Sequence, residues 1–324
     1  MPTSDRVFLT GATGFVGGHV LDALQAAGYR VRALARQRSE RLRGSDVVVG
    51  DLRAPGELRG ALEGCRYLIH CAALYTFSPR DREALHHVNV AGTAGLLEAA
   101  RLAGVERAVV TSSSATLGPQ RNGRPADERD WAEGGASSAY HHSKLEQERA
   151  AFMSGVPAIA LLPTAPVGPG DAKPTPTGKL IRDFADGRIF AMPPRGGLNV
   201  VPVEDVARAH VGALEHGKPG ERYVLGGENL TLDELWRILA ELTGRPLPSW
   251  RAPYALALGI AHLDELRCRL LPDAVPFAPL EGVRMSRERM FVDASKARRE
   301  LNFAPGSARD ALARAVAWYR GATV

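Results

Sequence analysis

Near its start the chain places a short apolar segment, residues 7–10, directly before three glycines, Gly11, Gly14 and Gly17. A helical pattern of apolar residues follows the last of them. The spacing G-x-x-G-x-x-G between a strand and a helix suits a dinucleotide pyrophosphate, because glycine permits unusual backbone angles and close approach to phosphate. The first N–H groups of the helix would face the anion. The sequence therefore predicts a nucleotide-binding turn.

Short apolar runs alternate with helical patterns up to about residue 165. We predict strands there at residues 7–10, 30–35, 46–50, 67–71, 108–112 and 158–162. This alternation is typical of an α/β fold, a doubly wound parallel sheet of the Rossmann type with helices on both faces. We place a nucleotide-binding domain at residues 1–165 with about 199–226. A smaller C-terminal α/β substrate-binding region takes residues 166–198 and 227–324, and includes a capping box at Thr231 and a last helix over about 307–320.

Composition and charge argue against several classes of function. The net charge is +5, but the basic residues are scattered and no basic run is interleaved with aromatics, so no nucleic-acid partner is expected. The three cysteines, Cys65, Cys71 and Cys268, have no paired metal-ligand spacing, so we expect no metal and no disulfide. The start of the chain lacks the pattern of a signal peptide, which predicts a cytoplasmic protein.

Residues 252–263 are apolar enough to raise the question of a membrane. About a dozen residues are too few to span a bilayer, so we expect no transmembrane segment. A core or substrate-facing helix is the preferred interpretation. Peripheral contact with lipid is the less favoured one.

A phenol and an ammonium group lie four residues apart, at Tyr140 and Lys144, and would share one face of a helix. The strand at residues 108–112 ends in hydroxyl groups, among them Ser113. A phenol that exchanges a proton near neutral pH needs a nearby cation, which Lys144 can supply, while Ser113 can hold the reacting oxygen against Tyr140. The alternative is an exposed helical pair and a polar strand end, which the nucleotide-binding context makes less favoured.

These residues resemble the extended branch of the short-chain dehydrogenase/reductase superfamily, the NAD-dependent epimerases and dehydratases, over essentially the whole chain. The closest resemblance, carried by residues 173–178, 223–231 and 282–285, is to hopanoid-associated sugar epimerases, and residues 162–169 resemble dihydroflavonol 4-reductase-like proteins. The resemblance implies that Asp51 and Leu52 flank an adenine and that Asn89 supports a water relay to Lys144. The candidate cofactor-binding residues are Gly11, Thr13, Gly14, Phe15, Val16, Gly17, Arg36, Asp51, Leu52, Cys71, Ala72, Ala73, Ser112, Tyr140, Lys144 and Pro163. The candidate catalytic residues are Ser113, Tyr140, Lys144 and Asn89.

The predicted second strand ends without the acidic residue that an NAD enzyme usually offers to the ribose. Arg36 stands there instead, with Arg38 close by in sequence, and a guanidinium suits a 2′-phosphate. The alternative is a pair of solvated surface arginines. We expect NADP(H) as cofactor, with NAD as the second possibility.

The reaction can be read in more than one way. Residues 162–169 lack the asparagine of many nucleotide-sugar enzymes, and Pro166 offers no N–H near a nicotinamide. We therefore expect a reductase that interconverts a ketone or aldehyde and an alcohol, with a sugar epimerase second and an idle NADP-binding regulator third. Candidate substrate contacts are Tyr75, Lys173, Thr175 and Arg182. The family resemblance also implies a possible homodimer.

Overall fold

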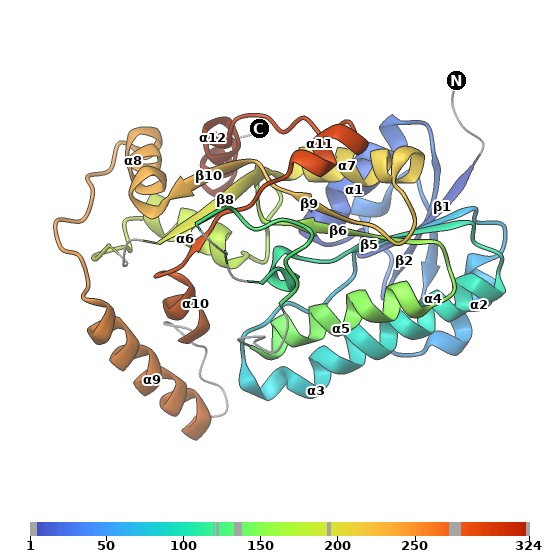
Figure 1. Ribbon diagram of the computed structural model, residues 1–324, viewed down its shortest axis with the longest axis horizontal. Coiled ribbons are helices and arrows are strands. Elements are labelled where there is room, and N and C mark those ends of the chain that lie inside the picture. The colour runs from blue at the N-terminus through green and yellow to red at the C-terminus, as the bar shows by residue number, and fades with distance from the viewer. Residues whose placement is uncertain are drawn as a thin grey trace.

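The computed structural model describes residues 5–118, 120, 123–132, 138–192, 196–271 and 280–321. Its main sheet has seven parallel strands in the order β3-β2-β1-β4-β5-β6-β9 (Figure 1). They are β1 (Arg6–Thr10), β2 (Arg30–Ala35), β3 (Asp46–Val49), β4 (Tyr67–His70), β5 (Arg107–Thr111), β6 (Ala158–Pro163) and β9 (Arg222–Leu225). The predicted Rossmann-like α/β fold is confirmed, and the six strands predicted before residue 165 are all present with ends shifted by one residue at most.

Helices cover both faces of this sheet. One face carries α1 (Phe15–Ala26) and α7 (Val203–His216), and the other carries α2 (Leu58–Leu62), α4 (Gly92–Leu102) and α5 (Ala139–Met153), as Figure 1 shows. Side chains along β1 alternate between the two resulting cores, because successive residues of a strand point to opposite faces. Val7 and Leu9 join the core under α1 and α7, whereas Phe8 joins the core under α4 and α5.

The strand order reverses between β1 and β4. Strand β1 lies between β2 and β4, so the connections from it lead to opposite sides of the sheet. In open α/β sheets, ligands bind outside the carboxyl ends of the strands at such a point. Thr10 and His70, which end β1 and β4, pair in register there.

A second, smaller sheet lies beyond the carboxyl ends of β6 and β9, since each of those strands runs almost directly into it. Its strands are β7 (Ala165–Val167), β8 (Gly197–Pro202), β10 (Glu228–Thr231) and β11 (Arg289–Met290). Its core is shared with α6 (Pro176–Ala185), α8 (Leu232–Thr243) and α12 (Ala308–Tyr319). The capping box at Thr231 and the predicted last helix are present. The segment 199–226, predicted to belong to the nucleotide-binding domain, is divided between the two sheets. Strand β8 belongs to the smaller sheet, whereas α7 and β9 lie with the main sheet. The domain division stays a prediction.

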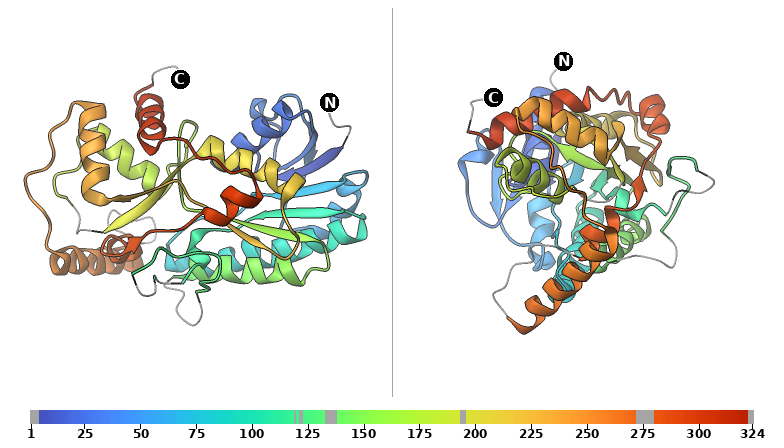
Figure 2. Two further views of the ribbon diagram at one scale, coloured as in Figure 1. Left: turned by 45° about the horizontal axis from the view of Figure 1, so that its top comes forward. Right: turned by 90° about the vertical axis from the view of Figure 1, so that its left-hand side faces the viewer.

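The long helix α9 (Tyr254–Leu270) and two short helices, α10 (Leu280–Met285) and α11 (Ser295–Glu300), complete the C-terminal part; α3 (Arg82–Leu85) precedes α4. Of the two alternatives predicted for residues 252–263, the core helix is wrong, and the substrate-facing helix stays a prediction. Of the α9 side chains only Ala261 and Asp264 are buried, and α9 lies at the edge of the molecule (Figure 2). The apolar sequence indicated burial, but only a narrow side of α9 contacts the rest of the protein. Within the described ranges, no helix has the length and apolar character to cross a membrane.

Candidate active site

The glycine turn joins β1 to α1 and leaves no room for side chains. Gly11 has φ +78°, and a Cβ there would lie 2.6 Å from the backbone N of Ala72. A Cβ on Gly17 would collide with the carbonyl oxygen of Gly11. Helix α1 begins after Gly14 with no side-chain cap and no acidic residue in its first turn. Its first N–H groups therefore fit an anion such as a pyrophosphate. The predicted residues Thr13, Phe15 and Val16 lie in the same turn.

The ends of β2 and β3 bring an arginine close to an aspartate. Arg36 directly follows β2, and its side chain is exposed. Asp51 lies beyond the end of β3 and pairs with Arg53, with a distance of 2.7 Å between Nη2 and Oδ2. Hydrogen bonds from Arg53 lower the pKa of Asp51, and the charge of Arg36 adds to this effect. Leu52 beside them is buried. This end of the sheet therefore presents guanidinium groups to a ligand.

The segment after β4 is held against β1 and β5. The backbone N of Ala72 donates to Thr10 Oγ1 at 3.2 Å, and the Thr111 hydroxyl donates to Cys71 Sγ at 3.2 Å. Burial raises the pKa of Cys71 to about 12, so its thiol stays neutral. The predicted residues Cys71, Ala72, Ala73, Ser112 and Pro163 thus lie at the carboxyl ends of β4, β5 and β6.

Ser113, Tyr140 and Lys144 meet at the end of β5. Ser113 follows β5, and its hydroxyl lies close enough to the Tyr140 phenol to lower the pKa of that phenol. Tyr140 lies in the first turn of α5, and Lys144 lies one turn later on the same side. The Lys144 Nζ donates to the carbonyl oxygen of Thr111 at 2.7 Å and to the Gln147 side chain. All three predicted groups therefore share one buried site.

Burial shifts the pKa values of the phenol and the ammonium group in opposite directions. It raises the pKa of Tyr140 to about 12, and the hydrogen bond from Ser113 opposes this shift. It lowers the pKa of Lys144 to about 8, while the charge of Glu148 opposes that shift. The influence of Lys144 on the Tyr140 pKa, expected from sequence, is not among the causes of the shift and stays a prediction.

Asn89 makes different contacts from those expected. It lies in a π-helical turn, η4 (His86–Ala91), a feature that often marks functional sites. Its amide accepts from the Leu74 N at 2.7 Å and donates to Leu74 O and Ser143 Oγ at 3.0 Å each. Asn89 thus ties the Leu74 segment to α5, and a water relay from it to Lys144 stays a prediction.

Sequence reasoning missed a chain of buried polar groups that extends from Lys144 to the glycine turn. Gln147 accepts from Lys144 and donates to Thr93 Oγ1 at 2.9 Å. The His70 ring bridges Thr93 Oγ1 at 2.8 Å and Thr10 Oγ1 at 2.7 Å. Burial lowers the pKa of His70 to about 3, so the ring is neutral. The only sequence signal was the spacing of Gln147, three residues after Lys144, because the other links join distant segments.

Aromatic rings surround the phenol. The Tyr75 and Phe77 rings contact the Tyr140 ring edge to face, with centroids 4.5 and 5.8 Å away, and Phe77 stacks on His141. Sequence analysis proposed Tyr75 as a substrate contact but missed Phe77. The surroundings of the candidate acid are therefore aromatic and apolar on this side.

The other candidate substrate residues lie at and before α6. Thr175 caps α6 by accepting from the Gly178 N at 3.1 Å, and its hydroxyl donates to Asp171 at 2.8 Å. Arg182 lies 3.4 Å from a carboxylate oxygen of Asp183. Lys173 is exposed in the preceding loop. Thr175 thus has a structural role whether or not it contacts a substrate.

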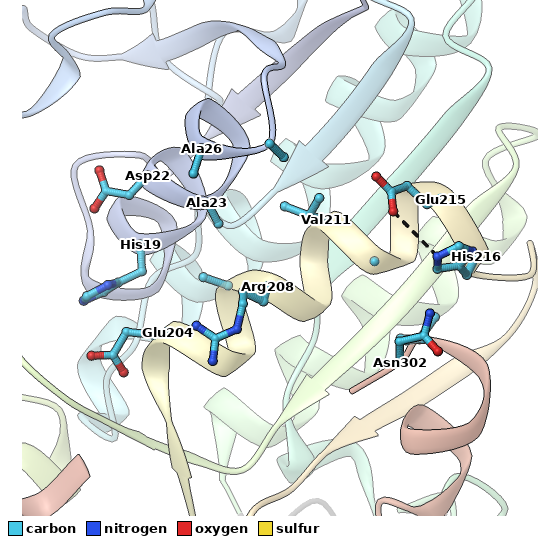
Figure 3. A pocket seen from close by; sticks show the side chains of 14 residues that line it. His19, Asp22, Ala23, Ala26, Glu204, Arg208, Val211, Glu215, His216 and Asn302 are labelled. Carbon is cyan, nitrogen blue, oxygen red and sulfur yellow. Dashed lines mark ion pairs between the residues drawn. The ribbon is translucent and has the colours of Figure 1, made fainter. Parts of the chain in front are cut away.

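A separate hollow of about 660 Å³ lies between α1 and α7 (Figure 3). Its lining includes His19, Asp22, Arg208 and His216, and none of the predicted catalytic or cofactor-binding residues. The hollow is open to solvent on the outer side of these helices. We therefore place the candidate active site at the strand ends and not there.

Comparison with known proteins identifies the family of this chain. The model of the NAD dependent epimerase/dehydratase family matches residues 7–226. A provisionally named dihydroflavonol 4-reductase from Synechocystis sp. is 40% identical over 98% of this chain and 95% of its own length. Sterol demethylase protein B from Methylococcus capsulatus is 37% identical over 96% of this chain and 97% of its own.

Solved structures of similar sequence also match nearly the whole chain. The crystal structure of gox2253 is 39% identical with a TM-score of 0.85 and covers 98% of both chains. MoeE5 in complex with UDP-glucose and NAD is 26% identical with a TM-score of 0.76 and covers 98% of this chain and 99% of its own. This chain therefore belongs to the NAD-dependent epimerase/dehydratase family and is an enzyme.

Proposed function

We propose that the protein is an NADP(H)-dependent oxidoreductase that interconverts a ketone or aldehyde and an alcohol. The observation that carries the proposal is that the Ser113 hydroxyl acts on the Tyr140 phenol, whose pKa it lowers, with buried Lys144 one helical turn away. This arrangement offers a proton donor and a second hydroxyl to one carbonyl oxygen, with a cation nearby.

In the direction of reduction, a bound nicotinamide supplies hydride to the carbonyl carbon. Ser113 donates a hydrogen bond to the carbonyl oxygen and holds it against Tyr140. The phenol, with a pKa of about 12, is protonated at neutral pH and gives its proton to the oxygen as the alcohol forms. Lys144, with a pKa of about 8, is mostly charged at pH 7 and stabilises the phenolate that remains. Water then returns a proton to Tyr140.

The preference for NADP(H) rests on Arg36. This exposed guanidinium follows β2, where the ribose of a dinucleotide lies in this fold, and it can pair with a 2′-phosphate. Asp51, the nearby carboxylate, is paired with Arg53. Since a relative binds NAD, the test compares both cofactors. Substituting Arg36→Gln should weaken NADPH binding about tenfold or more and leave NADH binding nearly unchanged. Arg30→Gln, at the opposite end of β2, is the matched control.

We propose an apolar, ring-containing carbonyl compound as substrate. The rings of Tyr75 and Phe77 next to Tyr140 suit the flat face of such a molecule. The name of the relative from Methylococcus capsulatus, a sterol demethylase protein, is consistent with this class. Contacts from Lys173, Thr175 and Arg182, a homodimer and a cytoplasmic location are parts of the same proposal.

The test is a turnover assay with purified protein, NADPH or NADH, and a panel of aldehydes, cyclic ketones, flavanonols and nucleotide-sugars. We expect consumption of NADPH with a ketone and a fall of about a hundredfold or more in kcat for Tyr140→Phe. Tyr29→Phe, the matched control, removes a phenol hydroxyl outside the site, just before the start of β2, and should leave kcat unchanged. Full activity of Tyr140→Phe would contradict the proposed role of the phenol.

A sugar epimerase is the second candidate, favoured by the 26% identity to MoeE5 with its bound UDP-glucose. An epimerase would invert a sugar carbon with no net change in nicotinamide absorbance. NMR of the nucleotide-sugar products therefore separates the two reactions.

A further inference from the structure

Helix α9 presents a row of large apolar side chains to solvent. We call this row the α9 apolar face and define it by Leu256, Ile260, Leu263, Leu266, Leu270 and Leu271. Each of them is at least 40% exposed, and Leu263 and Leu270 are about 70% exposed, at 68% and 71%. Spacings of three, four and seven residues bring most of them to one side of the helix. A contiguous apolar patch of this kind marks an interaction site.

The side of α9 next to this row is the one that packs on the protein. Ala261 and Asp264 are buried there, at 0% and 2% exposure. Asp264 accepts from Arg267 at 2.7 Å, so this carboxylate is satisfied inside the fold. The helix thus packs on the protein through Ala261 and Asp264, while its leucines project outward. Figure 2 shows α9 projecting from the rest of the molecule.

The charges around the α9 apolar face are mostly positive. Of the acidic side chains near it, Asp264 and Glu281 are buried, Glu265 is half-buried and pairs with Arg269 at 2.8 Å, and Glu288 is exposed. Arg269, Arg284 and Arg287 are exposed. Arg287 lies over the Tyr254 ring at 5.2 Å, at the start of α9. The leucine row therefore has arginines near both of its ends, a composition that suits an interface between apolar chains and anionic headgroups.

We propose that the α9 apolar face binds the surface of a membrane that contains anionic lipid. Helix α9 would lie in the plane of the interface, with its leucines among the acyl chains and its arginines at the headgroups. A second copy of the chain fits less well. In a two-fold antiparallel contact between two α9 helices, the arginines near one end would face those near the other end.

The position of α9 agrees with this role. The Arg80 side chain donates to the carbonyl oxygen of Cys268 near the end of α9, and Arg80 lies three residues after Phe77 in the candidate active site. Glu281 of the neighbouring α10 lies 3.8 Å from His141, next to Tyr140. The membrane-binding side and the candidate site therefore share one end of the molecule. The docking proposal itself does not depend on the reaction, because it is tested without turnover.

The test is flotation of the full chain with vesicles of phosphatidylcholine alone and of phosphatidylcholine mixed with phosphatidylglycerol. We expect binding to the mixed vesicles that weakens with added salt, and weaker binding to phosphatidylcholine alone. The double variant Leu263→Glu/Leu270→Glu should lose at least about tenfold in partitioning, because burying one leucine is worth roughly that factor. Met153→Glu, which adds a charge at another exposed apolar residue, is the matched control and should bind as before.

Two further measurements make each outcome decisive. Circular dichroism checks that the leucine double variant is folded. If that variant is unfolded, Arg284→Gln/Arg287→Gln takes its place, because it changes only exposed side chains and should weaken binding to the anionic vesicles. Absence of vesicle binding by the unaltered chain would overturn the proposal. So would a dimer in light scattering that the leucine variant converts to a monomer, because the face would then join two copies.

Discussion

The buried ion pair between Arg222 and Glu148 should be much more important for stability than any ion pair on the surface. Glu148 is fully buried on α5, and Arg222 lies at the start of β9 with its side chain 5% exposed. Arg222 also donates to the carbonyl oxygen of Glu128 at 2.9 Å and to Thr116 Oγ1 at 2.8 Å. Its guanidinium lies 3.6 Å from the centroid of the Trp131 ring.

The variant Glu148→Gln keeps the shape of the side chain and removes its charge. It leaves the Arg222 guanidinium charged and buried without its nearest counter-charge, and loss of one partner of a buried pair costs about 3–5 kcal/mol in comparable cases. Solvent screening does not reduce this cost, since neither side chain is more than 5% exposed. For a chain of 324 residues, the melting temperature should fall by roughly 4–8 °C.

The matched control is Glu241→Gln, which removes the same charge from the exposed pair of Glu241 and Arg309. Their side chains are 60% and 49% exposed, so the loss should be about 1 kcal/mol or less. Urea unfolding and calorimetry measure both variants. The double variant Glu148→Gln/Arg222→Met, which removes both charges of this pair, should lose less than the sum of the two single variants. Equal stability of Glu148→Gln and Glu241→Gln would refute the argument from burial.

Three other expectations follow from the site. Reduction by NADPH should slow as the pH rises through about 8, because Lys144 loses its proton there while Tyr140, with a pKa of about 12, keeps its own; a flat pH–rate profile up to pH 10 would contradict this. Gly11→Ala should abolish cofactor binding in a fluorescence titration, because its Cβ would lie 2.6 Å from the Ala72 N and φ is +78°. Gln147→Leu should move the pH at which the rate falls, whereas a purely structural role would lower stability without moving it.

The parts of the fold that follow local rules could be predicted from the sequence. Strands β1 to β6 and the turn at Gly11 were predicted, because apolar runs and glycine spacing act over a few neighbouring residues. Ser113 and Tyr140 meet because one ends a strand and the other starts the helix that covers it. The contacts of Lys144 with Gln147, and from there to Thr93, were not predicted, since they depend on how distant elements pack. The prediction of a core helix at α9 was wrong for the same reason, because an apolar sequence does not say which side of a helix contacts the rest of the protein.

The opposite pKa shifts of Tyr140 and Lys144 bear on the direction of the reaction. Both groups hold protons at neutral pH, so the cofactor-free site is ready to donate a proton and not to accept one. With a pKa of about 12, only about one phenol in 10⁵ is ionised at pH 7. Oxidation of an alcohol needs the phenolate, which the positive ring of an oxidised nicotinamide would stabilise. A reductase uses only the donating state, whereas an epimerase must use both states in every turnover. Burial of the phenol is therefore consistent with the proposed reduction, and an epimerase would need a larger fall in the Tyr140 pKa on cofactor binding.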